Sequence, residues 1–215
     1  MEYSIQKFIK KRPKTKIVCT IGPASSEVKT LKKMISEGMS VARLNLSHGT
    51  ISQHKMYVEN AKQAAQELDA PLGILIDIPG PKYRVGKIIG DYIDIKKGQK
   101  LILGNETILD GKIVNLKVWP EGISKEVGNS KQILLDDGLI KLSIDSKKGN
   151  NIFCTALNNA SLKSNKSVTI PGSVNKLDYF TEETVKGLRF AKKINATFVG
   201  LSFIRNSKDI KRVKE

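Results

Sequence analysis

Short apolar runs alternate with amphipathic segments over the first 80 residues of the chain. Strands are predicted at residues 16–21, 41–46 and 73–78, where Ile, Val and Leu gather between turn residues. Residues 27–37 and 51–68 instead place apolar side chains at helical spacing. A cap at Ser25 or Ser26 is expected to begin the first helix, and Gly38 to end it. This alternation predicts parallel strands joined by crossover helices.

The pattern changes between residues 82 and 173. Short alternating runs at 92–95, 100–103, 132–135 and 151–154 are separated by Gly, Asn and Asp turns, which predicts an inserted all-β domain. A helix at 181–193 capped by Thr181, a fourth buried strand at 197–203 and a charged helix after Ser207 then restore the first pattern. We therefore expect three segments, 1–81, 82–173 and 174–215, with the first and third forming one α/β domain.

Polar side chains stand where the apolar strands end. Arg43, Asn45 and Ser47 alternate along the second strand and its end, so they point the same way. Asp77 closes the third strand and two cations follow it. The alternation of elements alone allows an open doubly wound sheet or a barrel. Functional groups at several strand ends favour the barrel.

Charge narrows the choice of partners. The 215 residues contain 37 Lys and Arg against 21 Asp and Glu, a formal net charge of +16, which attracts phosphate-bearing ligands. The basic residues are dispersed and aromatic content is 6%, so a primary role in nucleic-acid binding is not expected. No apolar run is long enough for a membrane span. Cys19 and Cys154 match neither a zinc spacing nor a disulfide framework, and the basic amino terminus lacks a signal core, so a cytoplasmic location is expected.

Six ordered segments stand out: KIVCTIGPAS at 16–25, VARLNLSHG at 41–49, GILIDIPGPKYRVG at 73–86, DDGLI at 136–140, VTIPG at 168–172 and SFIR at 202–205. Together they closely resemble pyruvate kinase, and the resemblance runs from about Pro13 to the end of the chain. It implies part of a TIM (β/α)8 barrel, the first four strands, with an inserted small all-β, barrel-like lid domain. It also implies transfer of the phosphoryl group of phosphoenolpyruvate to ADP, giving pyruvate and ATP in the last step of glycolysis.

The resemblance assigns roles to single residues. Arg43 matches the arginine that binds the phosphoryl group, and Arg84 matches a second arginine near the phosphates. His48 and Lys166 match positions near the nucleotide, and Ser202 matches a residue near the phosphate. Plainer interpretations stay open: a strand-end arginine paired with a carboxylate for Arg43, a solvated turn residue for Arg84, and a strand cap for Ser202.

A monovalent-cation position is also implied. Asn45, Ser47, Asp77 and the backbone carbonyl of Ile78 match its oxygen ligands, which suit a hard cation such as potassium. Where potassium-dependent members commonly read DTKGPE, this chain reads DIPGPK at 77–82. The ammonium of Lys82 replaces a carboxylate, as in the potassium-independent branch, so we expect that K+ is not required. Alternatively, Lys82 faces solvent in a turn.

The resemblance also includes an acidic turn of the lid domain, whereas two motifs of the family are missing. Asp136 and Asp137 match an acidic turn that swings toward the nucleotide, although Asp-Asp-Gly is also an ordinary hairpin turn. The Lys-Ile-Glu and Gly-Asp-Leu-Gly motifs, with the catalytic lysine and the main Mg2+ or Mn2+ ligands, are absent from these residues.

Several expectations follow from those absences. These residues alone should be inactive and should expose apolar strand edges. A full-length form is implied to be a homo-oligomer, commonly a tetramer. We expect a portion of a complete kinase; the alternatives are a truncated relative that binds phosphorylated ligands or a partner chain, and an unrelated basic binding protein.

Overall fold

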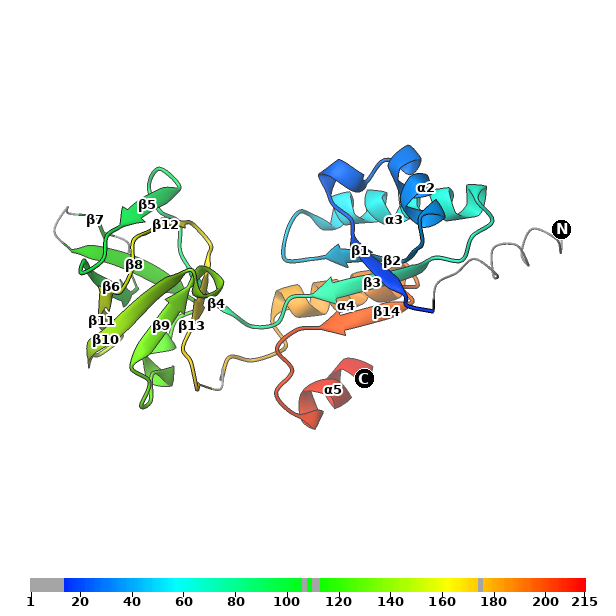
Figure 1. Ribbon diagram of the computed structural model, residues 1–215. Helices are drawn as coiled ribbons and strands as arrows, with labels where there is room; N and C mark the ends of the chain where they lie inside the picture. Colours follow the sequence, from blue (N-terminus) through cyan, green and yellow to red (C-terminus); the bar gives the residue numbers. More distant parts are fainter. Residues whose placement is uncertain (1–13, 106–107, 110–112, 174–175) are drawn as a thin grey trace. The chain divides into compact units, whose positions relative to one another are not determined.

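Two units of different architecture make up the chain in a computed structural model, which describes residues 14–105, 108–109, 113–173 and 176–215. One unit comprises Met1–Gly80 and Tyr179–Glu215, and the other comprises Pro81–Asp178. The chain thus leaves the first unit once and returns to it (Figure 1).

The first unit is built on a four-stranded parallel sheet. The strands lie in the order β1-β2-β3-β14, with bounds Ile17–Thr20, Met39–Asn45, Gly73–Ile78 and Phe198–Leu201. The helices of this unit are α2 (Val28–Ser36), α3 (Ile51–Glu67), α4 (Glu182–Lys193) and α5 (Ser207–Lys214). Each new strand is added beside the preceding one, which is the order expected for the first four strands of a (β/α)8 barrel.

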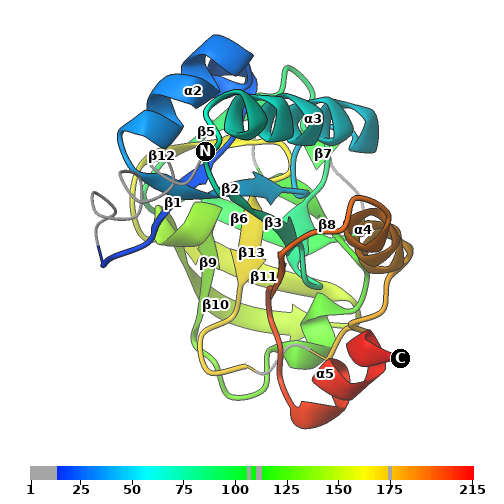
Figure 2. The same cartoon turned by 90° about the vertical axis from the view of Figure 1, so that its right-hand side faces the viewer.

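One face of this sheet is covered by helices. Figures 1 and 2 both show α2 and α3 on the same side of the strands. The core between them contains Ala42 and Leu44 from β2, Ile76 from β3, Leu31 from α2 and Ala61 from α3, all fully buried. Phe190 and Ala191 of α4 extend the same core. The alternation along β2 therefore sends its even-numbered side chains to the helices and leaves Arg43 and Asn45 for the opposite face.

Of the helix ends predicted from the sequence, two are confirmed by the structure and one is wrong. Thr181 caps α4 by accepting from the Thr184 amide at 3.2 Å, and Gly38 follows α2 with a φ of 111°. The predicted cap of α2 at Ser25 or Ser26 is wrong. Residues Pro23–Ser25 form a 3-10 turn, η1, in which the Ser25 hydroxyl accepts from Gly22 at 3.1 Å, so the helix starts later and uses Glu27 at its N-cap without a side-chain bond.

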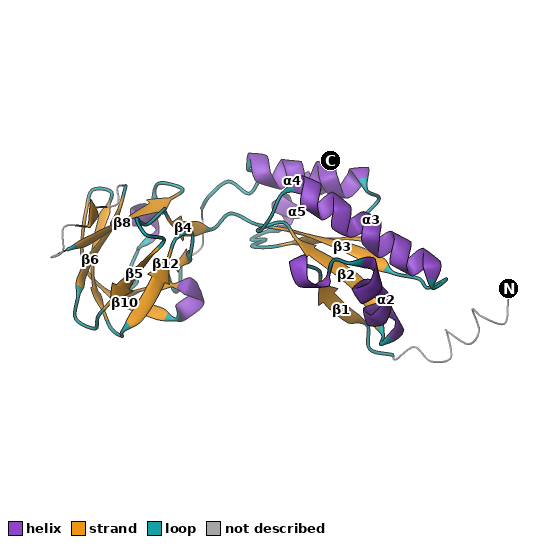
Figure 3. Ribbon diagram, turned by 90° about the horizontal axis from the view of Figure 1, so that it is seen from above, coloured by secondary structure: helices purple, strands orange, loops and turns teal. Residues whose placement is uncertain are grey.

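The second unit is a closed β-barrel. Its ring runs β4-β13-β9-β10-β11-β6-β8, and the pairing of β8 with β4 closes it, while β7 pairs with β8 beside the ring. The interior is apolar, with Leu103, Leu116, Ile133, Leu135 and Ile152 completely buried. Strands and loops dominate this unit (Figure 3). The alternating runs predicted an inserted all-β domain and the resemblance implied a barrel-like one, and the structure confirms both.

The ring strands have the bounds Tyr83–Val85 (β4), Lys100–Gly104 (β6), Val114–Trp119 (β8), Gln132–Leu135 (β9), Ile140–Lys148 (β10), Asn151–Ala156 (β11) and Ser167–Thr169 (β13). Beside them lie Ile108–Leu109 (β7) and the pair formed by Tyr92–Ile95 (β5) with Ala160–Lys163 (β12). Two 3-10 turns, η2 (Ile123–Glu126) and η3 (Asp136–Gly138), interrupt the strands.

The two outer strands of the parallel sheet expose apolar side chains, as the sequence predicted. Ile17 and Val18 of β1 and Phe198 and Val199 of β14 are all exposed. Within the described ranges, no helix combines the length and the apolar character that crossing a membrane requires.

Candidate active site

Arg43 and Asp77 form the centre of a polar cluster at the carboxyl ends of the parallel strands. The Arg43 Nε donates to Asp77 Oδ2 at 3.1 Å, and its Nη2 forms an ion pair with the same oxygen. Its Nη1 donates to the hydroxyl of Thr20, the last residue of β1, at 2.5 Å. The guanidinium thus bridges three neighbouring strands, and two contacts to one carboxylate fix its plane.

The fourth strand contributes Ser202, whose hydroxyl donates to Asp77 Oδ1 at 3.3 Å. Asp77 therefore uses one carboxylate oxygen for Arg43 and the other for Ser202. Its side chain is 17% exposed, so the carboxylate lies largely out of water beside a cation that balances its charge. The sequence placed Arg43, Asp77 and Ser202 at strand ends, and the structure brings them into one hydrogen-bonded group.

Asn45 lies beside Asp77 in the sheet. The two residues are direct partners in the β2–β3 ladder, so their side chains leave the same face. The amide oxygen of Asn45 accepts from the Ser47 backbone at 3.0 Å, and the Ile78 carbonyl accepts from the Ser202 backbone at 3.4 Å. Each predicted oxygen ligand of a monovalent cation thus lies at this edge of the sheet, and Asn45 and Ile78 already accept internal bonds.

A close approach of two strands shapes the same edge. A Cβ added to Gly80 would lie 2.2 Å from the Ser202 carbonyl oxygen and 2.8 Å from the Phe203 Cβ. Phe203 itself has a φ of 61°, a left-handed conformation that a bulky residue rarely adopts. The backbone after β3 therefore lies against the backbone after β14 with no room for a side chain at position 80.

Three other predicted site residues, Lys82, Arg84 and Lys166, belong to the second unit, where both lysines pair with carboxylates of the turn η3. Lys82 Nζ lies 2.9 Å from Asp137 Oδ1, and Lys166 Nζ lies 3.0 Å from Asp136 Oδ1. The Lys82 side chain is 22% exposed, and its ammonium group pairs with the Asp137 carboxylate. Arg84 lies in β4 and donates from Nη1 to the Asn165 carbonyl at 3.0 Å.

The acidic turn between β9 and β10 holds an uncommon conformation. Asp136 and Asp137 have φ values of 50° and 53°, and both belong to the 3-10 turn η3. The Asp137 carboxylate accepts from the Ser167 hydroxyl at 2.7 Å, and that hydroxyl accepts from the Asp137 amide at 2.9 Å. The hydrogen bond from Lys82, followed by that from Ser167, lowers the pKa of Asp137 below the usual aspartate range.

Ser47 and His48 follow β2 in an exposed turn. Two residues that contact or follow this turn, His54 and Thr50, were not among the predicted site residues. His54 on α3 contacts the His48 carbonyl, and Thr50 caps α3 through a reciprocal bond with Gln53. The Thr-x-x-Gln spacing is a readable signal for the cap. A single His within a helical pattern carries no comparable signal, because sequence alone does not show what its ring faces.

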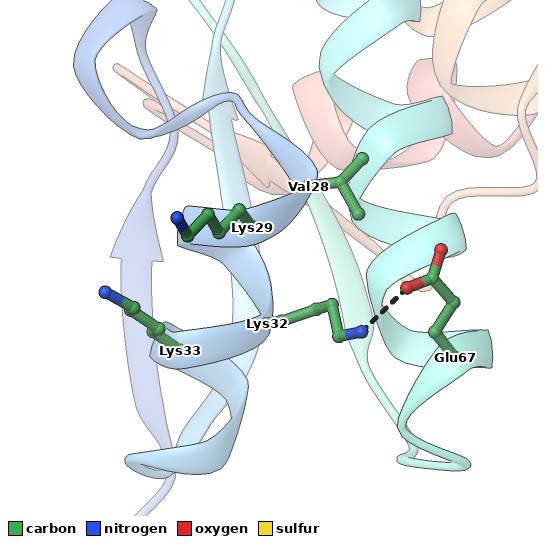
Figure 4. Close-up of a pocket in the computed structure, with 5 residues that line it drawn as sticks. All are labelled: Val28, Lys29, Lys32, Lys33 and Glu67. Atoms are coloured by element: carbon green, nitrogen blue, oxygen red, sulfur yellow. Dashed lines mark hydrogen bonds and ion pairs between the residues drawn. The ribbon is translucent and has the colours of Figure 1, made fainter.

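A hollow of about 510 Å3 opens elsewhere on the first unit, between α2 and α3 (Figure 4). It is lined by Val28, Lys29, Lys32, Lys33 and Glu67, none of them a predicted site residue. The ion pair between Lys32 and Glu67, 2.8 Å long, joins the two helices. In the part of the chain that the structure describes, no three His, Cys, Asp or Glu side chains gather into a metal-binding group.

Comparison with known proteins gives consistent relatives. The family described as pyruvate kinase, barrel domain, matches residues 12–215. A pyruvate kinase of Thermococcus litoralis is 38% identical over 201 residues, which cover 94% of this chain and 42% of that protein. A pyruvate kinase of Staphylococcus aureus (strain USA300) is 37% identical over 205 residues, covering 94% of this chain and 35% of that protein. The chain thus spans about two fifths or less of the length of these relatives.

Proposed function

Because this chain belongs to the pyruvate kinase family, we propose that the protein carrying these residues transfers the phosphoryl group of phosphoenolpyruvate to ADP, giving pyruvate and ATP. The proposal concerns the complete protein. The 215 residues contain neither the Lys-Ile-Glu nor the Gly-Asp-Leu-Gly motif of the family, so by themselves they are expected to bind ligands without turnover.

The observation that supports this proposal best is the Arg43–Asp77–Ser202 group at the carboxyl ends of the strands. In (β/α)8 enzymes this edge carries the active site. Phosphoryl transfer spreads negative charge over three oxygens of the transferring group, and catalysis relies on positioned positive charge. Arg43 has that charge at this edge, in a fixed plane.

The hydrogen-bond count of Arg43 suits such a role. A guanidinium has five N–H groups, and three are used by Asp77 and Thr20. One N–H on Nη1 and one on Nη2 have no partner among the described residues and can donate to phosphoryl oxygens. Asp77 then acts as a positioning residue, and Arg84 and Lys166 of the second unit are proposed to contact the phosphates and the nucleotide, with His48.

Divalent metal chemistry is assigned to other parts of the complete protein. The family generally uses Mg2+ or Mn2+, but the described residues offer no group of three ligands of the His, Cys, Asp or Glu type. What they supply is binding and orientation of the phosphoryl group.

Substitution of Arg43 tests the proposal. In the complete protein, Arg43→Gln should lower the rate of pyruvate formation by about 100-fold or more, since it removes a donor to the transferring group. The matched control is Arg189→Gln, an exposed arginine of α4, which should leave the rate within about twofold. Full activity of Arg43→Gln, in a folded protein, would sink the assignment.

Lys82 is proposed to take the electrostatic part of the free monovalent cation, so that K+ is not needed. Asn45, Ser47, Asp77 and the Ile78 carbonyl would otherwise surround that ion. Lys82→Glu should then create a potassium requirement: pyruvate formation low in sodium buffer and raised about tenfold or more by added K+. Lys87→Glu makes the same charge change at an exposed site and should create none. Equal rates of Lys82→Glu with and without K+ would contradict the proposal.

A further inference from the structure

The turn that joins β2 to α3 carries Ser47 and His48 and is held by bonds within the chain. The Leu46 amide donates to the Asp77 carbonyl at 3.0 Å, and the Ser47 amide donates to Asn45 Oδ1 at 3.0 Å. The His48 amide reaches the Asn45 carbonyl at 3.4 Å. These bonds fix the start of the turn on the sheet side.

His54 holds the other side of the turn. It lies in the first turns of α3, 5% exposed, and its Nε2 is 2.7 Å from the His48 carbonyl oxygen. A carbonyl oxygen only accepts, so Nε2 carries the hydrogen and donates it. The backbone of His48 is thereby tied to a buried helix while its side chain stays exposed.

The second ring nitrogen of His54, Nδ1, indicates why a histidine occupies this position. His54 Nδ1 is buried and has no partner among the described residues. A buried polar atom without a partner is unfavourable, and an apolar side chain of similar shape would avoid it. The ring also meets Tyr57 edge to face at 5.9 Å between centroids, and a Cβ on Gly49 would lie 3.5 Å from Nε2. Packing alone would suit Leu or Phe here, so the donor at Nε2 is the property that distinguishes histidine.

We propose that His54 is a positioning residue, whose Nε2 donor fixes the 46–49 turn and with it the placement of Ser47 and His48 for a phosphate-bearing ligand. Its value for ligand binding rests on the proposed function. The hydrogen bond itself does not, so the two parts can be tested separately on the same chain.

The first test uses the complete protein without ligand. The 15N signals of the His54 ring should show the Nε2–H tautomer. Two amide substitutions then test whether the donor must lie at the position of Nε2. The terminal nitrogen of His54→Gln reaches the place of Nε2. That of His54→Asn reaches only the place of Nδ1. We expect the Leu46, Ser47 and His48 amides to exchange with solvent about tenfold faster in His54→Asn than in wild type, and His54→Gln to restore slow exchange.

Two results would overturn the positioning role: an Nδ1–H tautomer, or equal exchange of the turn in the two amide variants. Unchanged exchange in the last turns of α3 serves as the check that each variant is folded. His54→Leu keeps the apolar packing without a donor and should behave like His54→Asn.

The second test adds phosphoenolpyruvate and follows the His48 ring signals. Binding should be about tenfold weaker in His54→Asn than in wild type and within about twofold in His54→Gln. No binding to wild type would count against the proposed function at this edge, while the exchange result still decides the hydrogen bond. Equal binding by both variants, with exchange differing as expected, would overturn the link between the turn and the ligand.

Discussion

At the scale of single residues, Asp77 is the group that joins the side chains of the candidate site. One carboxylate receives Arg43 on one oxygen and Ser202 on the other. The sequence could predict that these residues lie at one edge, because parallel strands end together. It could not predict that Arg43 would also bond Thr20, since that contact depends on the register of β1 against β2, in which the two residues are partners. The plainer interpretation of Arg43, pairing with a carboxylate, is seen in the structure, and the contacts to Asp77 and Thr20 leave two N–H groups for the ligand that we propose.

The ion pair between Lys82 and Asp137 should depend on pH. Lys82 lowers the pKa of Asp137, so the contact stabilises the fold above the ordinary aspartate pKa and is lost as pH falls through the lower, folded-state value. Because Asp137 is 77% exposed, the gain in stability is small and the pKa is the better measurement. In a carbon NMR titration, Lys82→Gln should raise the Asp137 midpoint and Lys87→Gln should leave it in place. The same midpoint in wild type and Lys82→Gln would argue against the pair in solution.

At the scale of elements, the period of apolar residues predicted helices and strands well, and local hydrogen bonds decided their ends. The change from helical spacing to short alternating runs predicted the inserted all-β domain, whereas its barrel form was implied only by the resemblance to the family. The start of α2 was misplaced because Ser25 bonds Gly22 within its own 3-10 turn and is not available to the helix. The strained conformation of the acidic turn at Asp136 and Asp137 could not be predicted either, because Asp-Asp-Gly fits several turn types.

The close approach of the chain after β3 to the chain after β14 should make a side chain at position 80 destabilising. Gly80→Ala should lower the free energy of unfolding by about 2 kcal/mol, because its Cβ would overlap the Ser202 carbonyl oxygen. Gly22→Ala is the matched control: it also precedes a proline, has an extended φ of −145° and meets nothing within 4 Å, so it should change stability by less than about 0.5 kcal/mol. Urea unfolding of both variants measures the difference. A loss in Gly80→Ala no larger than in Gly22→Ala would show that the close approach is absent.

At the scale of the whole molecule, the chain combines a parallel sheet that ends in two apolar edges with a barrel that has closed on itself. A closed ring leaves no edge strand to protect, whereas β1 and β14 expose side chains suited to further packing. The order of the four strands and the family relationship agree that these residues are barrel elements of a pyruvate kinase. The edge that carries Arg43, Asp77 and Ser202 is the part of the proposed reaction site that they contain.

The most direct test of this account is pyruvate formation from phosphoenolpyruvate and ADP by the complete protein purified from its host, first without and then with K+. We predict pyruvate and ATP in equal amounts in the absence of K+, with at most about a twofold gain when it is added. No pyruvate under either condition would contradict the proposed reaction, and activity only with K+ would contradict the role given to Lys82.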